Sequence, residues 1–188
     1  MLGIGGAAMT GATQKSRRLI VIVGFMGAGK TTVARELARL LNCRSIDLDE
    51  LISERERRTP GQIIEKSGED EFRRKETEAL REVLDQLNDD SSANIIALGG
   101  GAWIVNENRK LIAERDGFTV WLDAPFELCW QRIEDEDESR PLAHSREAAE
   151  KLMAERRSIY ELADLRIAVS TEQTQREVAL AIVNALPR

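Results

Sequence analysis

The chain has 188 residues, of which 42% are hydrophobic and 32% are charged, and its formal net charge is -6. This length can bury one sizeable core but hardly two, so we expect a single globular domain. The apolar runs are strand-sized and fall short of the roughly 20 residues of a membrane-spanning helix, which argues against a membrane protein. The negative charge argues against nucleic acid as the main partner, although local basic pockets for small anions are compatible with it.

The cysteines and the N-terminus give two further expectations. Cys43 and Cys129 lie far apart and form no CxxC or Cys/His pattern. This indicates neither a disulfide framework nor a zinc site, and favours reduced thiols in a cytoplasmic protein. Residues 1–18 contain no acid and are rich in Gly, Ala and Thr, which is typical of a disordered tail. A targeting peptide is the alternative, although its apolar part is short and broken by glycine, and Met9 offers a second start.

Strand and helix patterns alternate from Leu19 onward. Strands are expected at 19–23, 45–48, 95–98, 118–122 and, more weakly, 165–169. Helices are expected at 30–41, 60–68, 69–87, 106–115, 125–133, 146–160 and 174–186. The alternation predicts one domain over residues 19–188 with a three-layer α/β/α architecture and a five-stranded, mostly parallel sheet. Ligands of such sheets bind outside the carboxyl ends of the strands.

The first expected strand ends in GFMGAGKTT, which matches the phosphate-loop pattern G-x-x-x-x-G-K-[ST]. Glycines let successive backbone N–H groups turn toward phosphate oxygens, and the following helix presents its positive end to the same anion. Lys30 is expected to reach the β and γ phosphates, and Thr31 to offer its hydroxyl to Mg²⁺. A plain glycine turn beside a lysine is the alternative, which the flanking strand and helix argue against. The expected nucleotide contacts are Gly27, Ala28, Gly29, Lys30, Thr31 and Thr32.

Two carboxylates follow the second expected strand, in SIDLDEL. In many phosphate-loop proteins the strand that corresponds to residues 95–98 ends in a magnesium-binding Asp. Here that strand is followed by three glycines, Gly99, Gly100 and Gly101. Because side chains alternate along an extended segment, Asp47 and Asp49 are expected on one side. Asp47 would hold Mg²⁺ through water, and Asp49 would accept a proton or hydrogen bond from an acceptor hydroxyl. In the alternative, Asp47 only ends the strand and Asp49 caps the next helix.

Arg73 is the third candidate, and lies in the first turns of the expected helix 69–87. It follows Phe72, so its side chain is expected beside the buried stripe of this helix. A cation near a helix N-terminus is unfavourable by roughly a few tenths of a kcal/mol or more. We therefore expect Arg73 to meet an anion, with a solvated surface arginine as the alternative.

In combination these motifs resemble the shikimate kinase family, small P-loop kinases of the aromatic amino acid pathway. The resemblance covers roughly Leu19 to Leu186. It rests, in order, on GFMGAGKTT, IDLDELI, GEDEFR with Glu76 completing F-R-x-x-E, LGGGA, RPL at 140–142 and RRSIY at 156–160. A phosphate loop alone is shared by many functions, whereas this ordered set is specific. The resemblance implies a P-loop fold of the nucleoside monophosphate kinase type, with substrate-binding helices and a lid at about 134–145.

The resemblance also implies an activity, which is ATP-dependent phosphorylation of the 3-hydroxyl of shikimate with one Mg²⁺ per site. Asp49 would bind the shikimate hydroxyls and is the candidate general base, while Asp47 belongs to the magnesium site with Thr31. Arg73 and Arg156 would bind the shikimate carboxylate, and Gly100 would offer its backbone N–H.

Two further arginines complete the set that the resemblance implies. Arg140 matches the lid arginine that covers the phosphates and would act in catalysis with Lys30 and Asp49. Arg132 would stack on adenine. Partners are expected to be shikimate and ATP, with no nucleic acid and no membrane, and the protein is expected to be a monomer.

The chain departs from the family pattern in the lid and near the C-terminus. Five acids run from Glu134 to Glu138 beside the nucleotide, and the segment from Arg140 to Arg156 is a few residues short. The family often places a proline against adenine, but STEQTQREV contains none. His144, the only histidine, is expected to be solvated. A kinase for another small molecule, such as gluconate, and a catalytically silent nucleotide-binding module are the rival functions.

Overall fold

The computed structural model describes residues 19–87, 95–135 and 141–187. In these parts the chain forms one five-stranded sheet in the order β2-β3-β1-β4-β5, with every adjacent pair parallel. The strands are β1 (Ile20–Val23), β2 (Ser45–Asp47), β3 (Ile95–Ala97), β4 (Phe118–Asp123) and β5 (Leu165–Ala168). The predicted α/β class and five-stranded parallel sheet are confirmed.

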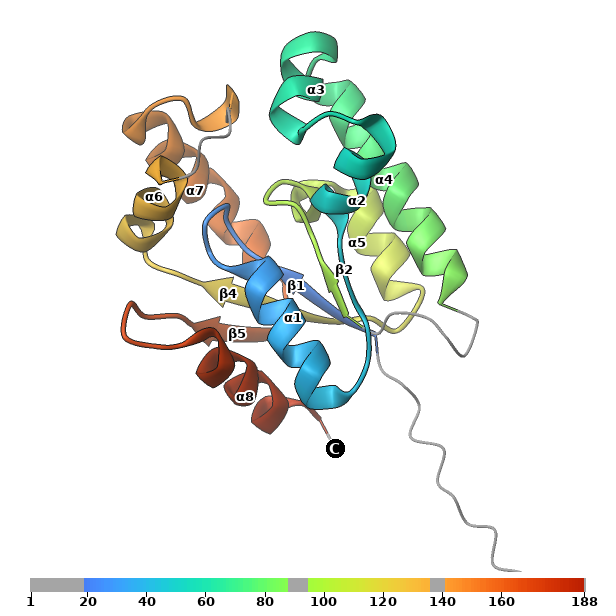
Figure 1. Cartoon of the computed structure of the whole chain (residues 1–188), viewed down its shortest axis with the longest axis vertical. Coiled ribbons are helices and arrows are strands. Elements are labelled where there is room, and N and C mark those ends of the chain that lie inside the picture. Colours follow the sequence, from blue (N-terminus) through green and yellow to red (C-terminus); the bar gives the residue numbers. More distant parts are fainter. Residues whose placement is uncertain (1–18, 88–94, 136–140, 188) are drawn as a thin grey trace, which may run out of the picture.

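Eight α-helices accompany the sheet in the described residues (Figure 1). They are α1 (Lys30–Leu41), α2 (Leu48–Glu56), α3 (Pro60–Ser67), α4 (Glu69–Gln86), α5 (Asn106–Ala113), α6 (Phe126–Glu134), α7 (Arg146–Tyr160) and α8 (Gln175–Ala185). Two short 3-10 turns, η1 (Ala102–Ile104) and η2 (Pro141–Ala143), lie between them. Helices α1 and α8 pack against each other, and α4 packs against α5 with η1 beside both.

The central strands explain why the sheet must be covered on both faces. All four residues of β1, and Ile95, Ile96 and Ala97 of β3, are buried. A strand whose side chains are apolar on both sides can be stable only between two layers of helices. The core extends into the helices through residues such as Val33 and Leu37 of α1 and Leu80 of α4. This packing fixes the carboxyl ends of β1, β2 and β3 as the floor of the site described below.

Several helices begin where local capping signals place them. Thr59 and Gln62 form a capping box at the start of α3, with Pro60 in its first turn. Thr174 and Glu177 do the same for α8. Ser145 accepts a hydrogen bond from the backbone N–H of Ala148 at the start of α7. These polar contacts satisfy N–H groups that the first helical turn leaves without a partner.

One expectation about local structure is wrong. Asp49 does not extend the second strand, because α2 begins at Leu48. Asp47 is the N-cap, and its Oδ1 accepts hydrogen bonds from the backbone N–H groups of Asp49 at 3.0 Å and Glu50 at 3.1 Å. The alternation argument for Asp47 and Asp49 therefore fails, since a capping carboxylate ends the strand two residues earlier. Asp49 sits in the first turn of a helix.

The expected N-terminal tail at 1–18 lies outside the described residues, as do Arg140 and the three acids from 136 to 138. The expected lid at 134–145 is described only on either side of that gap. Among the helices that the structure describes, none combines the length and the apolar character needed to span a membrane.

Candidate active site

A pocket of about 920 Å³ opens at the carboxyl ends of β1, β2 and β3. It is lined by the phosphate loop on one side and by residues of α2, α3 and α4 on the other, with α6 and α7 contributing arginines. Most of the residues predicted for the site meet here: Gly27, Gly29, Lys30, Thr31, Thr32, Asp47, Asp49, Arg73, Gly100, Arg132 and Arg156. Ala28 is buried in the loop and does not line the pocket.

The phosphate loop has the backbone conformation that only glycine adopts readily. Gly27 has φ 74°, and a Cβ there would lie 2.5 Å from the carbonyl oxygen of Cys129 in α6. Gly29, with φ 91°, is the N-cap of α1, which has no side-chain cap and no acid in its first turn. The first N–H groups of α1 are therefore left for a ligand, and the positive end of the helix points to the same place. Such a helix start suits a phosphate.

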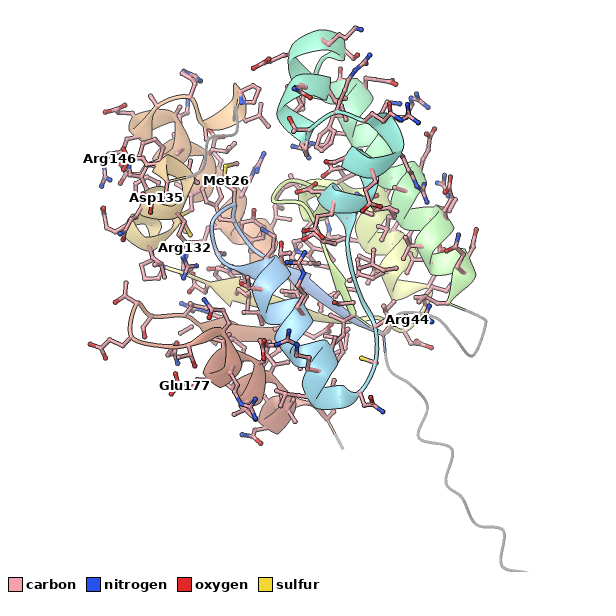
Figure 2. The ribbon with its side chains drawn as sticks, viewed as in Figure 1. Met26, Arg44, Arg132, Asp135, Arg146 and Glu177 are labelled. Atoms are coloured by element: carbon pink, nitrogen blue, oxygen red, sulfur yellow. The ribbon has the colours of Figure 1, made fainter. Side chains whose placement is uncertain are left out.

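Lys30 and Arg132 both contact backbone carbonyls of the loop. The Nζ of Lys30 donates to the carbonyl oxygen of Phe25 at 2.9 Å. Nη1 of Arg132 donates to the carbonyl oxygen of Gly27 at 2.9 Å. Figure 2 labels Met26 of the loop, Arg132 of α6 and Asp135 at the C-cap of that helix. Both cations thus contact the backbone of the phosphate loop, and both line the pocket beside it.

Thr31 and Asp47 face each other across the start of α1 and the end of β2. The hydroxyl of Thr31 donates to Oδ2 of Asp47 at 2.5 Å, while Oδ1 of Asp47 caps α2. A hydroxyl and a carboxylate are oxygen donors of the kind that Mg²⁺ prefers, and this ion commonly takes one or two protein ligands beside water and phosphate. No cluster of three or more acidic, His or Cys side chains suitable for a metal occurs among the described residues. The pair therefore fits a magnesium ion that shares its coordination with a nucleotide.

Asp49 and Glu76 come together over Gly99. A Cβ on Gly99 would lie 2.5 Å from Oδ1 of Asp49 and 2.6 Å from Oε1 of Glu76, so both oxygens face one small space. Glu76 is fully buried, and its Oε1 has no hydrogen-bond partner among the described residues. Burial, opposed by Arg73 and reinforced by the negative charge of Asp49, raises the pKa of Glu76 to about 7. Two carboxylates thus lie on the side of the pocket formed by α2 and α4, which we call the acceptor end.

Glu76 is a site residue to which the sequence analysis assigned no role. Its signal was present in the pattern, because it is an acid four residues after Phe72 and four before Leu80, both on the buried stripe of α4. A charged group at such a position is rarely buried without a partner. Its spacing of three from Arg73 also predicts a helical ion pair.

Arg73 meets an anion as expected, but the anions are carboxylates of its own helix. Its Nε and Nη2 donate to Oε1 of Glu69 at 3.1 and 2.8 Å, and Nη1 donates to Glu76. These contacts and the nearby carboxylate charges raise the pKa of Arg73 although burial opposes the shift. The guanidinium also packs directly against Gly101, where a Cβ would overlap it. Of five N–H groups, two stay available on the terminal nitrogens.

Arg156 and Tyr160 of α7 hold the glycine turn from the other side. Nη1 of Arg156 donates to the carbonyl oxygen of Gly100 at 3.2 Å, and the hydroxyl of Tyr160 donates to the same oxygen at 2.5 Å. Both residues are buried, and burial raises the pKa of Tyr160 to about 12, so its hydroxyl keeps the donated proton. Arg156 therefore faces the pocket from a fixed position.

Comparison with known proteins agrees with this arrangement. A family model described as shikimate kinase matches residues 26–187, which is most of the chain. This chain belongs to the shikimate kinase family. Among curated shikimate kinases, that of Geobacter sulfurreducens is 42% identical over 168 residues, covering 86% of this chain and 89% of the relative. The shikimate kinase of Cereibacter sphaeroides is 36% identical over 173 residues, covering 90% and 83%.

A solved structure, the shikimate kinase from Acinetobacter baumannii in complex with shikimate, matches with a TM-score of 0.79 at 36% identity. The match covers 89% of this chain and 91% of that one. A sugar kinase from Janibacter, at 19% identity and TM-score 0.63, shows the shared fold only. Membership of the shikimate kinase family makes this chain a kinase that uses ATP and leaves the silent-module alternative without support.

Proposed function

We propose that this chain transfers the γ-phosphoryl group of ATP to the 3-hydroxyl of shikimate. The observation that carries the proposal is that a single pocket is lined by the phosphate loop together with two arginines, Arg73 and Arg156, and the carboxylate of Asp49. Arg73 and Arg156 would form a cationic clamp for the carboxylate of shikimate. Asp49 would accept the proton of the hydroxyl that is phosphorylated. A small acid that carries several hydroxyl groups needs this combination of partners.

Each side of the pocket has a distinct role in the proposed reaction. The N–H groups at the start of α1 and Lys30 hold the β and γ phosphates of ATP. Asp49 accepts the proton of the attacking hydroxyl as general base. Arg132 stacks on adenine, and Arg140 covers the phosphates when the lid closes, excluding water from the transfer. Positioning and fixed charge carry most of the catalysis in phosphoryl transfer.

Magnesium belongs to the proposal as the ion that Thr31 holds directly and Asp47 holds through water. When bound, it would neutralise charge on the β and γ phosphates of ATP. We further propose a monomer in the cytoplasm, with neither nucleic acid nor membrane as partner. Light scattering after gel filtration tests the monomer.

The deciding experiment is an ADP-release assay coupled to a dehydrogenase, with shikimate, gluconate and water as acceptors. Shikimate is expected to support turnover far above the hydrolysis seen with water. Turnover with gluconate and none with shikimate would refute the proposal. Asp49→Asn should lower kcat by about 100-fold or more, the usual contribution of a general base, with little change in nucleotide affinity. Glu54→Gln, on an exposed residue that lines the same pocket, is the matched control.

A further inference from the structure

Arg73, one of the two arginines proposed to bind the carboxylate of shikimate, already forms ion pairs with carboxylates of the protein. Arg73 donates to both Glu69 and Glu76, so one positive charge is shared between two negative charges. The side chain of Glu69 is 42% exposed, and water can screen its charge. The side chain of Glu76 is 0% exposed, and its charge acts on Arg73 without such screening. The carboxylate of shikimate would therefore approach Arg73, whose positive charge is already balanced by ionised Glu76.

The charges around Glu76 come from three elements. Arg73 lies on the same helix, Asp49 comes from α2, and Arg156 comes from α7. The buried residues of three other elements that pack on α4 are neutral: η1 contributes Ala102 and Trp103, α5 contributes Asn108 and Ile112, and α3 contributes Gly61 and Ile63. The charged residues Glu107 and Arg109 of α5 are engaged elsewhere, with Arg81 and with backbone carbonyls. The charge state of this end of the pocket thus depends on very few groups.

Counting these charges shows the difficulty for an anionic acceptor. With every group ionised, the three acids Asp49, Glu69 and Glu76 outnumber the two arginines Arg73 and Arg156. A further carboxylate would add to an excess of negative charge in a partly buried pocket, where such repulsion is strong. A single proton, taken up by one of these acids as the ligand binds, offsets the negative charge that the ligand adds.

Glu76 is the group placed to accept that proton. Its Oε1 is buried, lines the pocket and has no hydrogen-bond partner among the described residues, while Oε2 faces Arg73. A protonated carboxyl can keep accepting from Arg73 through Oε2 and carry its proton on Oε1. We propose that Glu76 is a positioning residue that takes up a proton from solvent when the acceptor carboxylate binds, so that Arg73 stays in place and keeps its charge for the ligand.

The proposal rests on the proposed function, because it requires an anionic acceptor at Arg73. According to the proposal, the protonation of Glu76 makes the affinity for shikimate depend on pH. A carboxylate that enters beside Glu76 makes its ionised form less favourable, so bound protein holds more protons than free protein near neutral pH. Glu76 is already half protonated near this range. Affinity for shikimate should therefore fall as pH rises above neutrality.

Calorimetric titration of the full chain with shikimate tests this proposal. The heat of binding, measured at about pH 7.5 in buffers of different ionisation enthalpy, gives the number of protons taken up. Roughly 0.5 to 0.8 proton per shikimate is expected for wild type, for a carboxyl whose pKa rises by one or more units on binding. Glu76→Gln should bind shikimate with no proton uptake, whereas Glu78→Gln, which alters an outward-facing partner of Arg74, should keep it.

Three outcomes separate the possibilities. Wild type that binds and phosphorylates shikimate without proton uptake overturns the role of Glu76 and leaves the proposed function standing. Uptake that persists in Glu76→Gln likewise overturns it, because another group then takes the proton. Wild type that neither binds nor phosphorylates shikimate refutes the proposed function itself. If Glu76→Gln fails to fold, as judged by circular dichroism, the wild-type measurement and a shikimate Kd that does not rise with pH still decide against the proposal.

Discussion

The hydroxyl of Thr31 donates a hydrogen bond of 2.5 Å to Oδ2 of Asp47, and this contact joins the phosphate loop to the end of β2. Both oxygens belong to the proposed magnesium site, Thr31 through a direct contact and Asp47 through water. The other oxygen of Asp47 caps α2, so the same side chain fixes the helix that carries Asp49. One carboxylate therefore links the proposed metal site to the candidate base.

The dual role of Asp47 can be separated by substitution. Asp47→Asn keeps a good helix cap but loses the negative charge that attracts a cation. We expect the Mg²⁺ concentration for half-maximal turnover to rise by about tenfold or more, while the unfolding midpoint in urea changes little. Glu50→Gln is the control, because it removes a negative charge from the same helical turn. Glu50 pairs with Arg35, and its substitution should leave the Mg²⁺ requirement unchanged. An unchanged requirement in Asp47→Asn would remove this residue from the metal site.

The three glycines after β3 are expected to differ in sensitivity. A Cβ on Gly99 would meet Asp49 and Glu76, and one on Gly101 would overlap the guanidinium of Arg73. A Cβ on Gly100 points elsewhere, with its nearest atom the backbone nitrogen of Met26 at 3.2 Å. Gly99→Ala and Gly101→Ala should therefore raise the KM for shikimate most, whereas Gly100→Ala should act on the phosphate loop and the KM for ATP.

Steady-state kinetics with each substrate varied in turn checks this order. The resemblance gives Gly100 a backbone contact with shikimate, so from it a larger side chain there would be expected to spare ATP binding. The contact with Met26 changes that expectation, because Met26 belongs to the nucleotide loop. Suppose that Gly100→Ala raises only the KM for shikimate while Gly99→Ala and Gly101→Ala behave like wild type. The contacts expected at these three glycines would then not explain their sensitivity to substitution.

How much of the site can be predicted from sequence depends on how far apart its partners lie. The phosphate loop is contiguous, so its pattern alone predicts Lys30 and Thr31 at the end of β1. The capping box at Thr59 likewise needs only four neighbouring residues. Asp49 is harder to place, because a capping hydrogen bond that Asp47 accepts from the backbone N–H of Asp49 decides locally between strand and helix. Alternation along a strand could not reveal that competition.

Contacts across the fold lie beyond such local patterns. The hydroxyl of Tyr160 reaches the carbonyl oxygen of Gly100 over 60 residues of sequence, and only the packing of α7 against η1 brings them together. For Arg73 the sequence analysis predicted an anionic partner but did not use the helical spacing to Glu69 and Glu76, which could have identified two of them. The resemblance directed attention to a ligand, whereas the structure adds the internal carboxylates that compete with it.

Arg156 should affect one substrate and spare the other. Its guanidinium is buried, and its hydrogen bond to the carbonyl oxygen of Gly100 directs it into the acceptor end of the pocket. Removing one charge-assisted partner of a carboxylate commonly costs about 1.5–3 kcal/mol, which corresponds to roughly 10- to 100-fold in binding. Arg156→Ala is thus expected to raise the KM for shikimate by that factor with little change in the KM for ATP.

The neighbouring arginine supplies a matched control for this substitution. Arg157 points away from the pocket, pairs with Asp123 and stacks over Trp121. Arg157→Ala should leave both Michaelis constants close to wild type even if it lowers stability slightly. Equal weakening of shikimate and ATP in Arg156→Ala would show that this residue supports the fold of the pocket rather than the acceptor.

The raised pKa of Glu76 also predicts how stability depends on pH. Its value of about 7 in the folded chain exceeds the ordinary 4.5, so between these values the folded state binds more protons than the unfolded state. Stability from this group is present below pH 4.5 and is lost as pH rises to about 7, by an amount of the order of 3 kcal/mol. Glu76→Gln removes the titration, so its free energy of unfolding should improve relative to wild type between about pH 5 and pH 8. Urea unfolding of both proteins at these pH values measures the difference, and Glu78→Gln should show none. A constant gap between wild type and Glu76→Gln would mean that Glu76 stays ionised throughout.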